Sequence, residues 1–386
     1  MTTLTQTKMT SKGNFFSNPY LIFFLLLSIP FTVYAIRPDF AGVDTYGFLL
    51  LTCKGNTAAG ITGLPKIIFE ALPCNFLLLK TMLFFCAYAS GCFIIALARL
   101  FSKENGGKLA WLLFLSPATV ISFIPLENDA LGFPFLFAAQ FFFYKGLIEK
   151  NKGFFVLALG LLGIGFLLWR GAIFYLLGFS LNVIAFWVFS IPIVLFYGQT
   201  LLGEIFRTNF IQEDLSFQFH YHYALVLGLT GALFNRLLCI QTLFYFALGT
   251  IAAKFWILSL PFLAVGLVLG LEKAQAIIIP KQWKINLWQV LGIISVFCLA
   301  GASQTAWFNE PTTEHWQAIN YALSLDNNVN NDFGLGYWIL WKEGVTQSYQ
   351  SPYLERPLEP GQIFISEQDQ NCTLLKDFNH AKVYKC

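Results

Sequence analysis

Long apolar runs separated by short polar stretches dominate the pattern of this chain. The runs lack the period-two alternation of half-buried strands, so they predict helices, and each approaches or exceeds the roughly 20 residues that a helix needs to cross a bilayer. The first run is Tyr20–Ile36 and the last is Ile285–Ala306. Between them come Asn75–Ala98, Leu109–Pro125, Leu131–Leu147, Gly153–Trp169, Gly171–Gly198, Tyr221–Ala253 and Phe255–Leu271. The pattern predicts an all-α polytopic membrane protein.

Two of the runs leave the number of helices open. Gly171–Gly198 is either one helix bent at Pro192 or two short helices, and Tyr221–Ala253 can divide at Asn235-Arg236. We therefore expect a transmembrane domain over residues 20–306 with about nine to eleven spans.

Polar composition marks the two ends of the chain. Residues 1–19 are rich in Ser and Thr and predict a disordered tail. After residue 306, Asn, Asp, Glu, Gln and Pro become frequent, so residues 307–386 predict a small α/β soluble domain. Its helix is expected to begin at Thr312 or Thr313, and two of its strands at Gln362–Ser366 and Lys382–Cys386.

The basic residues predict the orientation. They collect in loops that share one side of the membrane if the N-terminus is cytoplasmic, as the positive-inside rule requires. Loops 37–74 and 126–130, and with two short helices also loop 199–220, then face outward together with the C-terminal domain. The expected location is the plasma membrane. The basic residues are Lys12, Arg99, Lys103, Lys108, Lys145, Lys150, Lys152, Lys273, Lys281 and Lys284.

Composition excludes two broad classes. The chain is 56% hydrophobic and 12% charged, which excludes an ordinary soluble protein. Its net charge of +3 is small and no basic run is long enough to indicate nucleic-acid binding. Among the eight cysteines, Cys53 with Cys74 and Cys372 with Cys386 form two possible disulfides if their segments face an oxidising compartment. Free thiols are the alternative.

Asp39 and Asp44 are the first candidate catalytic residues, because they follow the first apolar run at the expected outer interface. A carboxylate there can accept a proton from, or orient, a polar group that arrives from water. The alternative for Asp39 is a turn that begins after Pro38.

A second acidic stretch, Glu127-Asn128-Asp129, is expected on the same side. Glu127 and Asp129 are candidate catalytic residues, and capping of the following helix is the alternative. Two outward carboxylate clusters can bind a divalent cation such as Mg²⁺ or Mn²⁺, for which Asp44 and Asp129 are the candidate ligands, or divide into a base and an orienting group.

Arg207 and Arg170 are candidate ligands for a phosphate group, since the planar guanidinium suits phosphate oxygens. Arg207 is followed by His220 and His222 in an aromatic setting that suits a sugar phosphate beside a bilayer. An interfacial aromatic belt with snorkelling Arg side chains is the alternative.

Three stretches together resemble a known superfamily. Val43–Tyr46, Glu127–Asp129 and Asp332–Ile339, in this order, are similar to motifs of the GT-C superfamily of membrane glycosyltransferases, which use polyprenyl-phosphate-linked sugars. In the catalytic subunit of oligosaccharyltransferase, a member of this superfamily, the motif that follows the last membrane span has two Trp residues. This sequence has Asn330 and Asn331 at the corresponding positions. A turn that enters a buried segment is the alternative for the third stretch.

The resemblance implies an inverting transfer at the anomeric carbon of a polyprenyl-phosphate-linked sugar, with a lipid, glycan or protein as acceptor. Asp44 would be the base or orienting residue, assisted by Glu127 or Asp129, and Arg207 or Arg170 would hold the phosphate. A transporter or lipid flippase, and an inactive scaffold, are the alternatives. The candidate substrate contacts are Tyr46, His220, His222, Asp332, Tyr337 and Trp338.

Overall fold

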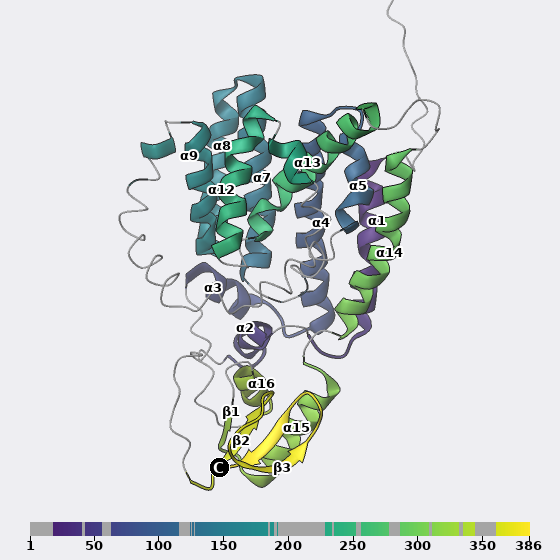
Figure 1. The fold of residues 1–386 in the computed structure, drawn as a ribbon. Helices are drawn as coiled ribbons and strands as arrows, with labels where there is room; N and C mark the ends of the chain where they lie inside the picture. The colour runs from purple at the N-terminus through teal and green to yellow at the C-terminus, as the bar shows by residue number, and fades with distance from the viewer. Residues whose placement is uncertain are drawn as a thin grey trace, which may run out of the picture.

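The computed structural model describes residues 18–40, 43–55, 63–115, 124, 126, 128–183, 186–188, 191, 228–233, 235–251, 256–277, 286–308, 311–331, 335–343 and 360–386. Most of these residues are helical. The apolar helices stand side by side in a bundle, and a small domain with one sheet lies beyond one end of the bundle (Figure 1).

Four helices in the described part of the chain are long and apolar enough to cross a membrane. They are α1 (Pro19–Ile36), α4 (Phe76–Phe101), α7 (Asn128–Glu149) and α13 (Trp256–Ile277). Each coincides with an apolar run expected from the sequence, which supports the membrane class. The larger number of spans stays a prediction.

Five further apolar helices belong to the described bundle. They are α5 (Leu109–Leu112) between the 3₁₀ turns η3 (Gly106–Lys108) and η4 (Leu113–Leu115), α8 (Lys152–Leu168), α9 (Ile173–Asn182), α12 (Arg236–Ile251) and α14 (Leu287–Phe308).

Two helix ends settle questions that the sequence left open. Helix α9 ends at Asn182, well before Pro192, because Val183 takes an extended conformation. Helix α12 begins at Arg236, where Asn235 Oδ1 accepts a hydrogen bond of 3.0 Å from the backbone N–H of Leu237. Of the two alternatives for Tyr221–Ala253, the structure therefore shows the division at Asn235-Arg236. Of the two alternatives for Gly171–Gly198, a single helix bent at Pro192 is wrong.

Aromatic stacking and small residues close the bundle. The rings of Phe143 on α7 and Phe179 on α9 stack with centroids 4.1 Å apart. The helical segment 228–233 meets α13 backbone to backbone, since a Cβ atom on Gly266 would lie 2.0 Å from the carbonyl oxygen of Gly228. Such close approach is typical of helix pairs in membranes, where small residues take the place of a hydrophobic seam.

The C-terminal domain packs one helix on a four-stranded sheet. Helix α15 (Thr313–Leu325) buries one face and packs against β2. The sheet has the order β1-β2-β4-β3, with β1 and β2 parallel and the other pairs antiparallel. A short helix, α16 (Gly336–Trp341), follows the first strand. The strands are β1 (Val329–Asn331), β2 (Ile363–Ser366), β3 (Thr373–Asp377) and β4 (Lys382–Lys385).

Two helices of the segment between α1 and α4, α2 (Val43–Lys54) and α3 (Gly63–Ala71), lie between the bundle and the C-terminal domain (Figure 1). A disulfide between Cys53 and Cys74 ties the end of α2 to the residues that lead into α4. A second disulfide joins Cys372 to Cys386 across the sheet. Both predicted pairs are confirmed.

We expect the disulfides to be visible by thiol labelling of the unfolded protein. Four cysteines in the described chain are free, so a maleimide should label four of the eight before reduction and all eight afterwards. In the Cys53→Ser, Cys74→Ser variant, labelling before reduction should be unchanged, and labelling after reduction should fall by the two replaced cysteines. Labelling of all eight cysteines without reductant, measured by mass, would contradict both pairs.

Candidate functional site

The two acidic stretches meet at the end of the bundle next to α2. The Thr45 hydroxyl accepts a hydrogen bond of 2.9 Å from the backbone N–H of Leu126, and both residues are fully buried. Thr45 follows Asp44 in the first turn of α2, and Leu126 immediately precedes Glu127. The hydrogen bond therefore holds the backbone at Asp44 against the segment that leads into α7.

Asp129 lies in the first turn of α7 and is only 6% exposed. Its Oδ1 accepts a hydrogen bond of 2.8 Å from the backbone N–H of Ala130. Carboxylates are stabilised at this position because the first N–H groups of a helix have no partner within the helix. The contact is of the capping kind, and it fixes the carboxylate at the same end of the bundle as Asp44.

A basic residue between α8 and α9, Arg170, lies at this same end of the bundle. Arg170 opens the 3₁₀ turn η5 (Arg170–Ala172), directly after Trp169. The Trp169 ring packs edge-on against Phe133 of α7, with centroids 5.5 Å apart. The backbone of Arg170 therefore lies beside the first turns of α7, near Asp129. The side chains of Arg170 and Asp44 lie outside the described part of the structure.

Asp39 sits in a different setting, where its carboxylate is already occupied. Oδ1 accepts from Arg37 Nε at 3.0 Å, and Oδ2 accepts from the indole N–H of Trp316 at 2.8 Å. Arg37 Nη2 also donates to the carbonyl of Pro311 at 2.6 Å. These contacts connect the end of α1 to α15, so Asp39 joins the bundle to the C-terminal domain.

Lys80 completes this cluster and is not among the candidate residues predicted from the sequence, since it lies inside an apolar run. Its side chain is buried and donates to the carbonyls of Tyr34 at 3.0 Å and Arg37 at 2.6 Å. The ammonium group also lies over the rings of Tyr34 and Phe40. Arg37, Asp39, Lys80 and Trp316 are called the joint below. The feature of the sequence that could have identified Lys80 is a single charged residue within an otherwise apolar run.

Two of the residues predicted to contact the substrate are buried. Tyr46 is 1% exposed and packs between the rings of Trp316 and Trp341, at centroid distances of 5.5 and 5.7 Å. Burial, reinforced by the charge of Asp39, raises the pKa of the Tyr46 phenol. Trp338 is fully buried, against the His315 ring. Tyr46 and Trp338 therefore lie in the packing between α2 and the C-terminal domain. Tyr337, the third predicted substrate contact in this region, is half-buried.

The remaining predicted site residues lie outside the described residues. They are Glu127, Arg207, His220, His222 and Asp332. Among the residues that the structure describes, no group of three or more His, Cys, Asp or Glu side chains is placed to hold a metal ion. The divalent cation proposed between Asp44 and Asp129 therefore stays a prediction.

Comparison with models of known protein families and with curated proteins finds no match to this sequence.

We expect Thr45→Val to destabilise the protein, because the buried N–H of Leu126 would lose its acceptor. An unsatisfied buried donor costs about 1–3 kcal/mol. Thr45→Ser keeps the hydroxyl and is the matched control. The midpoint of thermal unfolding in detergent should fall for the valine variant and stay close to the wild-type value for serine. Equal midpoints for valine and serine would contradict a structural role for this hydrogen bond.

Proposed function

We propose that the protein is a membrane glycosyltransferase of the GT-C type, which transfers a sugar from a polyprenyl-phosphate-linked donor to an acceptor at the extracytoplasmic face. The observation that supports this most is the hydrogen bond between Thr45 and Leu126. It brings together two acidic stretches that are far apart in sequence, at a bundle end where a lipid-linked donor and an acceptor from water can meet.

The proposed reaction is a displacement with inversion. Asp44 accepts the proton of an acceptor hydroxyl, whose oxygen attacks the anomeric carbon as the bond to the phosphate oxygen breaks and polyprenyl phosphate leaves. Glu127 or Asp129 assists directly or through Mg²⁺ or Mn²⁺, and Arg170 or Arg207 binds the departing phosphate. Holding donor and acceptor in one place supplies much of the rate.

The distribution of charge supports the proposed orientation in a plasma membrane. Lys103 and Lys108 follow the end of α4 that points away from α2, and Lys145, Lys150 and Lys152 surround the turn between α7 and α8 at that same end (Figure 1). With the N-terminus cytoplasmic, these lysines face the cytoplasm and the acidic stretches face outward.

The direct test is transfer of radiolabelled sugar from a panel of polyprenyl-phosphate donors by the purified protein in proteoliposomes. Transfer that needs the protein and exceeds that of empty liposomes is expected with at least one donor. Sugar or lipid movement across the bilayer without transfer would overturn the proposal.

A transporter or flippase is the second candidate, and Gln140 favours it. This residue lies inside the candidate span α7, is fully buried, and neither polar atom of its side chain has a hydrogen-bond partner among the described residues. Polar side chains within spans commonly mark a transport path. Gln140→Leu should abolish movement of substrate by a transporter, whereas a glycosyltransferase should retain its activity.

A further inference from the structure

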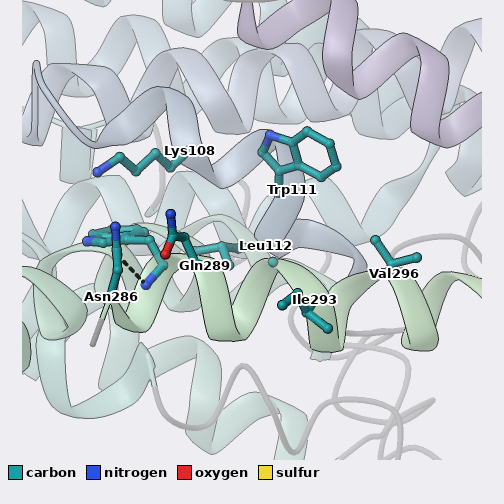
Figure 2. A pocket seen from close by; sticks show the side chains of 9 residues that line it. Lys108, Trp111, Leu112, Asn286, Gln289, Ile293 and Val296 are labelled. Carbon is teal, nitrogen blue, oxygen red and sulfur yellow. Dashed lines mark hydrogen bonds between the residues drawn. The ribbon is translucent and has the colours of Figure 1, made fainter. Parts of the chain in front are cut away.

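A groove unrelated to the acidic stretches lies between α5 and the first turns of α14, at the end of the bundle away from the C-terminal domain. Its volume is about 600 Å³. The Ser295 hydroxyl donates to the backbone carbonyl of Trp111 and holds the two helices together on one side of the groove. Figure 2 shows the lining side chains, with a polar group of residues at one end and aliphatic residues at the other.

The polar end of the groove presents hydrogen-bond donors and one positive charge. The Lys108 ammonium lies 4.6 Å from the centre of the Trp288 ring, and it donates to Asn105 Oδ1 at 2.5 Å. Asn105 is oriented in turn by its amide, which donates to Glu272 at 2.7 Å. A lysine has three N–H donors, so Lys108 retains donors for an anion. The amide of Gln289 lines the same end.

The other end of the groove is apolar and open. Ile293 is 61% exposed and Val296 is 51% exposed on the outer face of α14. Between the two ends lies Gly292, where an added Cβ atom would meet nothing within 4 Å. A cation beside Trp at a helix end, followed by aliphatic residues along the helix, matches the order of headgroup and acyl chain in a bilayer leaflet.

We infer that this groove binds an anionic phospholipid, with the phosphate at Lys108 and Gln289 and one acyl chain along Gly292, Ile293 and Val296. The charge selects the headgroup, because the lining residues in the described chain include Lys108 and no carboxylate. The inference is independent of the proposed glycosyltransferase activity, whose described residues lie at the opposite end of the bundle.

The test is native mass spectrometry of the detergent-purified protein titrated with phosphatidylglycerol or with phosphatidylcholine of the same acyl chains. The wild type should retain phosphatidylglycerol more strongly. Lys108→Gln should weaken this binding about fivefold, which corresponds to the roughly 1 kcal/mol that one basic residue contributes near an anionic leaflet. Gly292→Leu should weaken binding of both lipids because it fills the groove.

Matched controls separate the groove from the rest of the surface. Lys103→Gln removes an exposed lysine of the neighbouring loop, and Gly301→Leu makes the same change on α14 where an added Cβ also meets open space. Both should bind phosphatidylglycerol as the wild type does. Equal binding of the two lipids by the wild type, unchanged selectivity in Lys108→Gln, or displacement of the lipid by millimolar inorganic phosphate would overturn the inference.

Discussion

Asp44→Asn is expected to lower the rate of sugar transfer by a factor of about 100 to 10,000, which is the usual contribution of a general base. The amide has nearly the same size as the carboxylate but cannot accept the proton of the acceptor hydroxyl. The neighbouring residue Thr45 keeps its hydrogen bond to Leu126, so the fold should be unaffected. The measurement is the initial rate of transfer from the best donor in proteoliposomes.

Glu70→Gln is the matched control for this substitution. Glu70 is an exposed carboxylate on α3, in the same segment between α1 and α4, and its ion pair with Lys66 is a surface pair one helical turn apart. Such pairs contribute little to stability, so activity and unfolding midpoint should match the wild type. If Asp44→Asn transfers sugar at the wild-type rate, Asp44 is not the base, and Glu127 and Asp129 become the next residues to replace.

The helices that were easiest to predict from sequence are those whose length alone identifies them. Runs such as Tyr20–Ile36 and Asn75–Ala98 coincide with α1 and α4 within a few residues. A long apolar segment without the alternation of a strand satisfies its backbone in lipid by forming a helix. The end of α9 at Asn182 was not predictable in the same way. No proline or glycine near Val183 marks the position where the helix stops.

The joint shows why individual roles were harder to predict than the fold. Asp39 looked like a free carboxylate at a membrane edge, but Trp316, which accounts for half of its hydrogen bonding, follows it by 277 positions. The burial of Trp338 likewise depends on His315 and Trp316 across the small domain. Partners at such separations leave no local pattern, whereas the meeting of the two acidic stretches could be anticipated from their common side.

Asp39→Ala is expected to destabilise the protein strongly. The change removes the carboxylate that pairs with Arg37, whose side chain is 5% exposed, and leaves the buried Lys80 beside it. Breaking a buried ion pair from one side costs about 3–5 kcal/mol. Because the side chain of Asp39 is 24% exposed, we expect about 3 kcal/mol, seen as a lower midpoint of thermal unfolding in detergent.

Asp369→Ala is the matched control, since this aspartate also pairs with a cation, Lys382, at 2.5 Å. Its side chain is 88% exposed, so solvent and salt screen the pair and its removal should change the midpoint little. Similar midpoints for the two alanine variants would show that the contacts of Asp39 do not stabilise the fold.

A double-mutant cycle shows whether Asp39 acts by connecting the bundle to the C-terminal domain. Trp316→Phe removes the indole N–H that donates to Asp39 but keeps an aromatic ring against Tyr46. If the two residues act through their hydrogen bond, the double variant should lose less stability than the two single losses added together. Proteolysis should then release the C-terminal domain from Asp39→Ala and from the double variant at similar rates. Strictly additive losses would mean that Asp39 acts through Arg37 alone, and the connection to α15 would depend on the hydrogen bond from Arg37 to Pro311.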